Sequence, residues 1–519
     1  MRKYLGGFFR NKDFTEISMD LNEHNPVNEE PEETPGTDSP SGEEQAKPAD
    51  KKRKRSRIRE DLEAIVLAII FVVVIREYVA EAYKIPTGSM EPTLMGNSNG
   101  HENGDNIIVD KAYYWFHPVE RWDVVVFKYP EPSLMPAAGE SERNGPSPPR
   151  GGDYPLPGHR GQGEDGGSPE DNSPVVLYRR NFIKRCVALP GEKIEIKHGD
   201  IYITNDSGLN DEIPRKPHRV QEALWQRVYF SNFDSKNPFE GRNWDLPASS
   251  RYEVRGGVLV VRARGGRDVQ FTREEIKDDR IGEDNKIAAD NGGVGMHGSN
   301  YVGDLMIETA VTFADDDSRL TLVIVEDDCT YSAVLGPGKA TVSWLLGRGP
   351  RPEEGDAEQV DFAFAKNVEY KVRFINVDDR LSLWVDGRVV WGEHRFTGED
   401  ARPAYTDDHD NLRLGNASAT IKVKGGTVRF RSINIYRDIY YTDKKNDGGH
   451  ALTRPYQVPE GHYFVLGDNS ARSSDSRNWG TFPRENLIGR ACFVFFPIYP
   501  ILDIEKKRLE FKSRMKLIR

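Results

Sequence analysis

Three short polar clusters, far apart in the sequence, contain side chains that could do chemistry. Residues 86–94 place Ser89 in a turn flanked by prolines, and residues 183–192 place Lys184 in a strand-like run. Residues 467–480 form a polar loop after a short apolar run. Alone, each cluster has an ordinary interpretation: a turn, a solvated lysine and an ion-paired loop. A serine hydroxyl attacks well only after a base removes its proton, and, with no histidine in any cluster, the candidate base is the lysine.

A lysine acts as a base only in its neutral form, which is rare in water. With an unperturbed pKa of about 10.4, only about one lysine in 2,500 is neutral at pH 7, and lowering the pKa by about three units corresponds to about 4 kcal/mol. Burial can supply this shift because desolvation disfavours the ammonium form. The sequence offers apolar residues that could surround the amine: Ile85, Met90, Phe182, Ile183 and Val187.

Short apolar runs rich in β-branched residues surround these clusters. Residues 106–110, 123–127, 178–188 and 194–203 are typical of buried strands, and residues 463–497 contain further short apolar runs. We therefore expect a mainly β fold in which strands position the reactive side chains.

In this order, and after a single strongly apolar segment, the three clusters resemble the conserved boxes of bacterial type I signal peptidases. These are membrane-bound serine endopeptidases with a Ser/Lys dyad. The matching segments are about 76–130, 178–203 and 456–500. The resemblance implies that Ser89 is the catalytic nucleophile and Lys184 the general base, and that the substrates are the signal peptides of exported preproteins.

The same resemblance implies supporting roles for other residues. Ser473 would orient the lysine amine, and Thr87 with the backbone N–H of Ser89 would form the oxyanion hole, although the family often has serine where Thr87 stands. Ile85 and Ile183 would help to line two shallow pockets for the small side chains one and three residues before the cut. Four residues would support the polar loop, the last two of them as an ion pair: Gly467, Asp468, Asp475 and Arg477.

Other features of the sequence limit the ligands to be expected. It contains no phosphate-binding loop, dinucleotide fingerprint or H-E-x-x-H motif, so we expect no cofactor and no metal. The net charge of −11, with one dense basic run at residues 51–55, argues against a nucleic-acid partner. Three distant cysteines, Cys186, Cys329 and Cys492, indicate neither a structural zinc site nor a disulfide framework.

The amino-terminal part predicts a cytoplasmic tail followed by a membrane anchor. Residues 1–59 contain a stretch rich in Pro, Glu, Gly and Ser and then the basic run, and we expect them to be disordered. Residues 64–75 carry no polar side chain. Extended over residues 62–80, a helix would span about 28 Å of a hydrocarbon core of about 30 Å, so we predict a transmembrane segment at residues 60–80. The basic flank would keep the amino terminus in the cytoplasm and place the catalytic domain on the outer, periplasmic side of the plasma membrane.

The catalytic domain is predicted in two parts, 81–204 and 457–519. Within the first part, residues 131–174 are rich in Pro, Gly, Ser and charge, which predicts a flexible loop. Residues 205–456 show many alternating apolar segments separated by Gly, Asp and Asn turns, such as Asp386-Gly387. This pattern predicts an inserted antiparallel β-sandwich, weakly similar to concanavalin-like lectins, which would bind a glycan or a protein ligand or act as a spacer.

Alternatives stay open for the apolar segment and for the function. The segment could be a core helix, since residues 64–75 alone would rise only about 18 Å, whereas the long preceding tail does not suit a cleaved signal peptide. A self-cleaving repressor-type peptidase shares the Ser/Lys chemistry, but the anchor and the lack of a helix-turn-helix region argue against it. An anchored glycan- or partner-binding protein with an inactive peptidase part is the other alternative.

Overall fold

The computed structural model describes most of the residues at which the sequence predicts strands. It describes residues 57–96, 104–130, 181–204, 213–231, 233, 239, 244–248, 251–263, 267–278, 298–327, 329–345, 356–395, 416–442, 449–452, 454–496, 498–503, 508–513 and 515–518. The predicted disordered tail up to residue 56, with its basic run, and the predicted loop at 131–174 lie outside the described residues.

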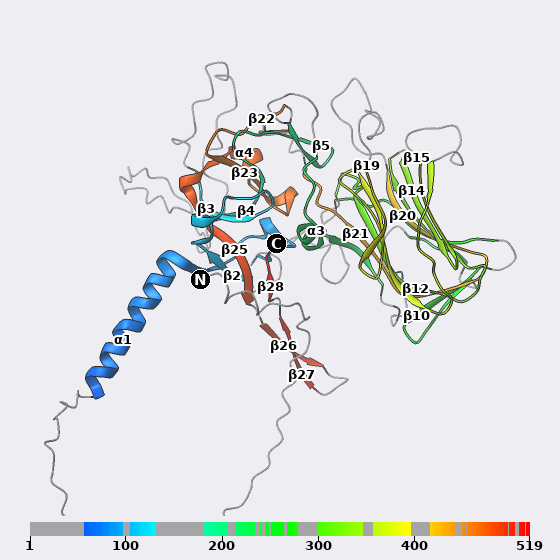
Figure 1. Cartoon of the computed structure of the whole chain (residues 1–519), viewed down its shortest axis with the longest axis horizontal. Helices are drawn as coiled ribbons and strands as arrows, with labels where there is room; N and C mark the ends of the chain where they lie inside the picture. The colour runs from blue at the N-terminus through cyan, green and yellow to red at the C-terminus, as the bar shows by residue number, and fades with distance from the viewer. Residues whose placement is uncertain are drawn as a thin grey trace, which may run out of the picture. The chain divides into compact units, whose positions relative to one another are not determined.

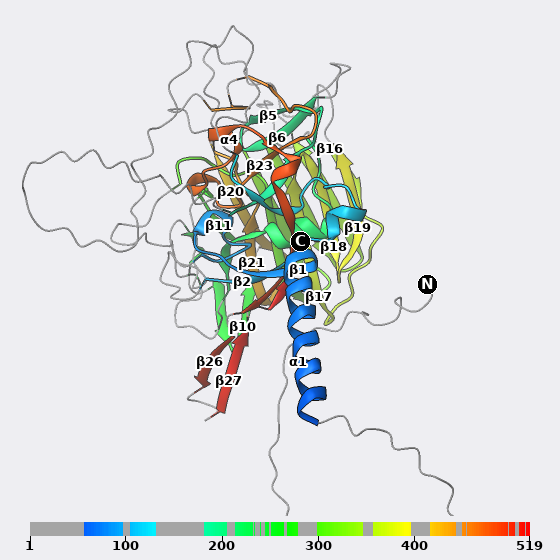
Figure 2. The same ribbon diagram turned by 90° about the vertical axis from the view of Figure 1, so that its left-hand side faces the viewer.

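The described part of the chain begins with a helix. Helix α1 (Arg57–Val74) continues as a short π-helix, η1 (Ile75–Val79), and α1 is unbroken in both views (Figures 1 and 2). The large apolar side chains of α1 are exposed, for example Leu67 at 67% and Phe71 at 65%. Within the described ranges, no helix combines the length and the apolar composition that crossing a membrane requires.

Eight described strands form an antiparallel sheet in the order β1-β2-β25-β3-β4-β23-β24, with β28 beside β25. Figure 1 labels six of them: β2, β3, β4, β23, β25 and β28. They are β1 (Ala80–Lys84), β2 (Asn106–Asp110), β3 (Val124–Lys128), β4 (Asn181–Ala188), β23 (His462–Leu466), β24 (Phe482–Pro483), β25 (Leu487–Phe496) and β28 (Lys516–Leu517). Strand β25, which follows residues 205–456, lies between β2 and β3, which precede them. Strands from both sides of these residues therefore share one sheet, as a domain interrupted by an insertion requires.

Two smaller sheets and several short helices complete this part of the chain. The small sheets are β22-β5-β6, made of β22 (Tyr456–Gln457), β5 (Lys193–Lys197) and β6 (Asp200–Thr204), and the pair β26 (Ile498–Asp503) and β27 (Arg508–Ser513). The short helices are α2 (Tyr113–Phe116), α3 (His218–Leu224), α4 (Ser476–Trp479), η2 (Gly88–Met90), η7 (Ser470–Arg472) and η8 (Arg484–Asn486). The first polar cluster lies on η2, and the third lies on η7 and α4.

Two further antiparallel sheets lie between these parts in the sequence. One has the order β19-β18-β17-β12-β21-β10-β9, with β7 beside β21, and the other β16-β15-β14-β13-β20-β11-β8. Their strands are β7 (Gln226–Phe230), β8 (Trp244–Asp245), β9 (Tyr252–Arg255), β10 (Val258–Arg262), β11 (Val269–Arg273), β12 (Leu305–Phe313), β13 (Arg319–Glu326), β14 (Cys329–Gly336), β15 (Lys339–Leu345), β16 (Asp356–Gln359), β17 (Glu369–Val377), β18 (Arg380–Val385), β19 (Arg388–Arg395), β20 (Ala417–Lys424) and β21 (Thr427–Arg437).

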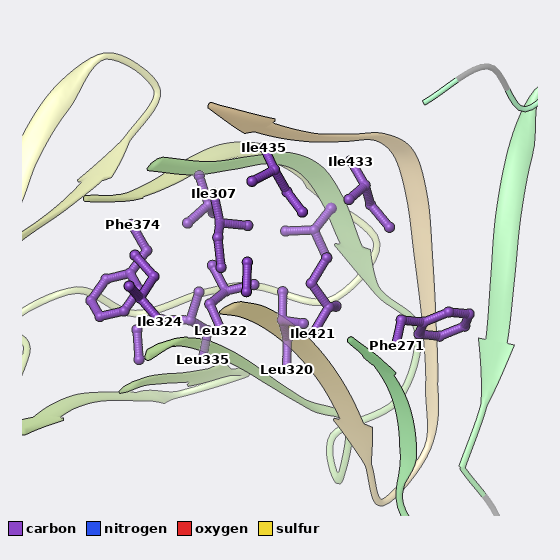
Figure 3. Packing of buried hydrophobic residues seen from close by; sticks show 14 of the residues in the cluster. Phe271, Ile307, Leu320, Leu322, Ile324, Leu335, Phe374, Ile421, Ile433 and Ile435 are labelled. Atoms are coloured by element: carbon purple, nitrogen blue, oxygen red, sulfur yellow. The ribbon is translucent and has the colours of Figure 1, made fainter. Parts of the chain in front are cut away.

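These two sheets bury one common apolar core. Figure 3 shows Ile307 and Phe374 of one sheet packed with Leu322 and Ile421 of the other. On β13 every second residue from Leu320 onward is buried, which is the alternation expected of a strand with one face on a core. The chain is therefore mainly β, and the two sheets form a β-sandwich.

The hairpin predicted at Asp386-Gly387 is confirmed. This pair joins β18 to β19, with Val385 paired to Arg388 across the turn. The φ angles are 49° at Asp386 and 77° at Gly387. Two positive φ angles are the mark of a type I′ turn, whose twist suits a tight hairpin and which Asp-Gly adopts readily.

The chain enters and leaves the sandwich at one place. Strand β7 pairs antiparallel with β21, and Gln226 at the start of β7 is the register partner of Arg437 at the end of β21. The Cα atoms of such partners lie roughly 4.5–5.5 Å apart. An insertion with its ends this close does not push the flanking strands apart.

Segments on both sides of the sandwich pack outside it. Val220 of α3, before the sandwich, and Tyr441 and Ala451, after it, are buried in one apolar cluster with Ile194 of β5. The predicted insertion at 205–456 therefore includes residues that contribute to the core of the flanking domain.

Candidate active site

Ser89 lies on the 3-10 turn η2, a few residues after β1. Its side chain is 8% exposed, and the neighbouring Met90 is buried in an apolar cluster with Ile107 of β2. On the other side, Gly96 lies against the backbone of Thr87, where an added Cβ would overlap the Thr87 carbonyl. Close packing on both sides of the turn fixes the position of the Ser89 hydroxyl.

Lys184 lies on β4, between β3 and β23, and reaches the serine directly. Its side chain is 3% exposed, and its Nζ lies 2.8 Å from Ser89 Oγ and 2.9 Å from the carbonyl oxygen of Ile183. The centre of the Phe182 ring lies 5.5 Å from the same nitrogen. The fold thus brings together a hydroxyl and an amine 95 positions apart, at the distance that a nucleophile and its base require.

The surroundings of Lys184 favour its neutral form. Burial lowers the pKa of Lys184 to about 8. The carboxylates of Asp475 and Asp468 act in the opposite direction, because negative charge favours the ammonium form, whereas Arg477 adds to the lowering. With a pKa near 8, about one amine in ten is neutral at pH 7, against about one in 2,500 for a lysine in water.

Asp468, at the start of the third cluster, is joined to β4 by a buried ion pair. Arg185 donates from Nε to Asp468 Oδ1 and from Nη2 to Asp468 Oδ2, both at 2.8 Å, and neither side chain is exposed. Arg185 also donates from Nη1 to the carbonyl of Trp122 at 2.8 Å. Because Arg185 follows Lys184 on the strand, this bidentate pair fixes the third cluster relative to the lysine.

Asp475 and Arg477 form a second buried ion pair, at the start of α4. Arg477 donates from Nε to Asp475 Oδ1 at 2.9 Å and from Nη2 to Asp475 Oδ2 at 2.7 Å, and both side chains are fully buried. Asp475 Oδ2 also accepts from the N–H of Gly467 at 3.1 Å. Burial alone would raise the pKa of Asp475, but the guanidinium and the hydrogen bonds hold it below its usual range. The carboxylate is therefore charged when it acts on Lys184.

Gly467 is a point of close approach between the third cluster and the turn η2 that contains Ser89. A Cβ at this position would overlap the carbonyl oxygen of Ser89 and the side chain of Ser473. Asn469 adds two hydrogen bonds to the same turn, from its N–H to Ser89 O at 3.0 Å and from Nδ2 to Gly88 O at 2.9 Å. Ser473 is fully buried beside Gly467, and its role in orienting the lysine amine stays a prediction.

The residues expected to bind substrate also lie near the serine. Thr87 precedes η2 and is exposed. Ile85, 3% exposed, and the half-buried Ile183 belong to the same apolar cluster as Met90, the residue after Ser89. The roles of Thr87 in an oxyanion hole and of the two isoleucines in a substrate pocket stay predictions.

Arg185 and Asn469 hold the site together and were not singled out from the sequence. Both lie within the polar clusters: Arg185 follows Lys184, and Asn469 follows Asp468. Arg185 could have been noticed because it is a charged residue in the otherwise apolar second half of β4, next to the candidate base. Its long-range partner could not be chosen from the sequence, because 30% of the chain is charged.

Among the described residues, one group of carboxylates has the spacing of metal ligands. It consists of Asp200, Asp304 and Asp378, whose oxygens lie within 4.8 Å of one another. The ammonium of Lys216 contacts Asp378 at 2.7 Å and Asp438 at 2.8 Å. A buried ammonium therefore contacts one of these carboxylates, and the group lies where β6, which begins at Asp200, meets the sandwich, which contains Asp304 and Asp378.

The site therefore contains a buried serine and a buried lysine whose pKa is lowered, supported by two ion pairs. The sequence matches the family described as signal peptidase, peptidase S26, over residues 58–248 and 410–496, together more than half of the chain. The chain belongs to the signal peptidase family. Members of peptidase S26 are serine peptidases, in agreement with the geometry around Ser89. The unmatched residues 249–409 fall within the sandwich.

Individual signal peptidases match shorter stretches of the chain. A probable signal peptidase I-1 of Synechocystis is 31% identical over 145 residues, which cover 28% of this chain and 51% of that protein. The signal peptidase I of Bacillus licheniformis is 33% identical over 126 residues, covering 22% and 68%. That of Aquifex aeolicus is 43% identical over 74 residues, covering 14% and 26%. The chain thus spans about half the length of the Synechocystis relative.

Solved structures with some likeness to this signal peptidase family member include a laminarinase catalytic domain and a carbohydrate-binding module. The catalytic domain of a laminarinase from Thermotoga maritima is 11% identical with a TM-score of 0.28, covering 42% of this chain and 99% of that chain. A carbohydrate-binding module from Bacillus subtilis is 11% identical with a TM-score of 0.24, covering 37% and 95%. At TM-scores this low, the likeness carries no argument about the sandwich.

Proposed function

We propose that this chain is a membrane-anchored signal peptidase I that cleaves signal peptides from exported preproteins, with Ser89 as nucleophile and Lys184 as general base. The observation that carries the proposal is the 2.8 Å hydrogen bond between Lys184 Nζ and Ser89 Oγ, in surroundings that lower the lysine pKa to about 8. Membership of a family of serine peptidases supports the reaction class.

In the first half-reaction, the neutral amine of Lys184 accepts the hydroxyl proton of Ser89 while Oγ attacks the carbonyl carbon of the scissile bond. One N–H of this amine donates to the carbonyl of Ile183 at 2.9 Å, which leaves its lone pair to the serine. The N–H of Ser89 and the hydroxyl of Thr87 would stabilise the oxyanion that forms. The ammonium then gives its proton to the leaving amine, and the signal peptide remains as an ester on Ser89.

In the second half-reaction, Lys184 takes a proton from a water molecule that attacks the ester carbonyl. The tetrahedral intermediate collapses, the proton returns to Ser89 Oγ, and the signal peptide leaves with a new carboxylate. The lysine has to lose its proton again at every turnover. The pairing of Asp475 with Arg477 and of Asp468 with Arg185 matters here, because an uncompensated carboxylate near the amine would favour the ammonium form.

A preprotein with a known signal peptide tests this function. The detergent-solubilised full chain is incubated with a preprotein carrying alanine one and three residues before the mature sequence, and the cut site is read by mass spectrometry. We expect one cut directly before the mature sequence. The Ser89→Ala chain, purified in parallel, should leave the preprotein intact; a cut that persists in this variant would point to a contaminating peptidase and remove the support for the proposal.

We further propose that the apolar segment beginning in α1 anchors the chain in the plasma membrane, with the amino terminus in the cytoplasm. The apolar side chains of α1 are exposed, and the basic run at 51–55 precedes them. At the other end of this segment, the N–H of Lys111 donates to the carbonyl of Val79. Shortly after Lys111 in the sequence, Trp115 and Phe116 of α2 are 61% and 80% exposed. Aromatic side chains favour the interface between lipid and water, which supports a membrane surface here.

The anchor predicts a defined topology. Protease added to intact spheroplasts should degrade a tag placed after Arg519 and spare a tag placed before Met1, because the basic run is retained on the cytoplasmic side. Immunoblots of the two tags measure the outcome, and detergent-lysed cells, in which both tags are lost, are the control. A protected carboxy-terminal tag would place the Ser89 site in the cytoplasm, where it would not meet exported preproteins.

We propose that the sandwich proper spans residues 226–437 and that the rest of the predicted insertion at 205–456 belongs to the peptidase domain. The pairing of Gln226 with Arg437 supports this division, as does the burial of Val220 and Tyr441 with the core of the flanking domain. Whether the sandwich binds a glycan or a protein stays a prediction.

Replacing residues 227–436 by a short Gly/Ser linker should leave a folded peptidase. The ends to be joined are register partners, so a linker of about two to four residues closes the gap with little strain. Above pH 9, the deletion variant should cleave a short signal-peptide substrate with kcat/KM within about tenfold of the full chain, since no residue of the proposed dyad is removed. A variant that is folded by circular dichroism but inactive on the peptide would mean that the sandwich contributes to the site. Loss confined to full preproteins would favour a substrate-recruiting role.

A further inference from the structure

The chain returns from the sandwich to the peptidase through a short segment, residues 438–442, which we call the return strap. Its first residue, Asp438, follows β21 directly and is 1% exposed. The N–H of Asp438 donates to Asp304 O at 2.9 Å, and its carboxylate lies 2.8 Å from the ammonium of Lys216. The same ammonium lies 2.7 Å from Asp378, which follows β17 of the sandwich. The start of the strap is therefore fixed to the sandwich by buried charges.

The rest of the return strap is part of the peptidase. Ile439 and Tyr441 are buried in the cluster that contains Phe464 and Leu466 of β23, the strand that leads into the Gly467 loop. At the end of the strap, the N–H of Thr442 donates to Ser470 Oγ at 2.8 Å. Ser470 is 5% exposed and lies on η7, inside the third polar cluster.

Ser470 and the strap complete the hydrogen bonds of the Arg477 guanidinium. Arg477 Nη1 donates to Thr442 O at 2.7 Å and to Ser470 Oγ at 2.8 Å, and Nη2 donates to Ser470 O at 2.7 Å. The remaining donors go to Asp475, from Nε and Nη2. A guanidinium has five N–H groups, and all five are accounted for. Ser470 Oγ accepts from both the strap and Arg477, so it joins the two.

We propose that Ser470 is a positioning residue for the Ser89–Lys184 dyad. Its hydroxyl links the return strap to Arg477, so the attachment of the strap to the sandwich affects how firmly Arg477 is held on Asp475. The proposal rests on the proposed function, because it assigns a role in the work of Lys184. The charges that act on Lys184 are those of Asp475, Asp468 and Arg477, and Asp468 is compensated by Arg185.

The direction of the effect follows from these charges. Without the Ser470 hydroxyl, Arg477 loses one acceptor and the N–H of Thr442 loses its partner. The strap then contacts Arg477 only through the bonds from Nη1 to Thr442 O and Oγ1, so the guanidinium is held less firmly on Asp475. A less compensated carboxylate favours the ammonium form, so the pKa of Lys184 should rise. Because the neutral amine is the active form, the rate should fall on the acidic side of the profile and recover at high pH.

The test is the pH dependence of kcat/KM for a signal-peptide substrate with the detergent-solubilised full chain. Ser470→Ala should move the acidic limb of the pH profile to higher pH. We expect activity about three- to tenfold lower at pH 7 and within about twofold of the unchanged chain on the plateau above pH 9. Ser470→Thr keeps the hydroxyl and should restore the profile. Ser418→Ala, which removes a similarly buried hydroxyl from β20 of the sandwich, should leave the profile unchanged.

The link to the sandwich is tested by a double-variant cycle. Asp378→Asn weakens the attachment of the strap to the sandwich through Lys216. It should move the acidic limb of the pH profile to higher pH, as Ser470→Ala does, but should cause no further change in the Ser470→Ala background. If Ser470→Ala does not fold, Ser470→Cys, which keeps a weaker acceptor, must show the upward shift.

Two outcomes would overturn the inference. One is a Ser470→Ala pH profile that superimposes on that of the unchanged chain. The other is a loss of rate at every pH with the same apparent pKa, as a purely structural role would give. Failure of the proposed function looks different, because the unchanged chain would then not cleave the substrate, or Lys184→Ala would cleave it as well as the unchanged chain does.

Discussion

Lys184→Ala should lower kcat/KM for a signal-peptide substrate by about 10²–10⁴-fold at pH 8, the range found for removal of a general base. The Lys184 amine is hydrogen-bonded to Ser89 Oγ at 2.8 Å, and without it the hydroxyl keeps its proton. Because the lysine is buried, truncation also leaves a cavity; Lys184→Met, which fills the space without a base, should lose the same activity. Cleavage of a fluorogenic peptide measures both variants, and circular dichroism checks that they are folded.

Three further variants separate the chemistry from general effects of substitution. Ser89→Ala should be inactive at every pH, and Lys184→Arg should fail because a guanidinium cannot be deprotonated near neutral pH. Lys193→Ala, which removes an exposed lysine of β5, should cleave like the unchanged chain. If Lys184→Arg keeps activity within about tenfold of the unchanged chain, Lys184 is not the base.

Asp468→Asn should lower the Tm of the peptidase domain by about 6–20 °C. The substitution leaves Arg185 fully buried without its carboxylate, and breaking one side of a buried ion pair costs about 3–5 kcal/mol. In a domain of about 150–250 residues, 1 kcal/mol corresponds to about 2–4 °C. Since Arg185 follows Lys184, cleavage should fall together with stability.

The matched control for this variant is Asp316→Asn. Asp316 pairs with Lys366 at 2.7 Å, but the two side chains are 73% and 43% exposed. Pairs in water contribute only about 0–1 kcal/mol, so the Tm should move little. Scanning calorimetry of the full chain measures both variants. A melting curve for Asp468→Asn within about 2 °C of the unchanged chain would show that the buried pair contributes little to stability.

Local features of the fold could be predicted from the sequence because they depend on neighbouring residues. The Asp386-Gly387 hairpin is one example, since two residues that tolerate positive φ lie between apolar runs. Many of the strands could be placed in the same way, and β13 shows the predicted alternation. The Ser89 and Lys184 clusters could be found because, together with the polar loop and in this order, they resemble the conserved boxes of type I signal peptidases. Their contact depends on how β4 packs against η2, which no local pattern contains.

Long-range pairings could not be predicted for a different reason. Arg185 and Asp468 are 283 positions apart, and any of many acidic residues could have been the partner. The carboxy-terminal boundary of the sandwich could not be predicted either, because the apolar residues Ile439 and Tyr441 continue the pattern of β21 without a break in composition. Only the packing of Tyr441 with the core of the flanking domain separates the return strap from the sandwich.

The pH dependence of kcat/KM for peptide cleavage by the unchanged chain tests the central claim most directly, under conditions where chemistry is rate-limiting. Burial lowers the pKa of Lys184 to about 8, and only the neutral amine can accept the serine proton. The rate should therefore rise about tenfold per pH unit below pH 8 and level off above it, with one apparent pKa close to 8. A profile that is flat from about pH 6 to 10, or one that rises only near the pKa of about 10.4 of a lysine in water, would contradict a Ser89–Lys184 mechanism.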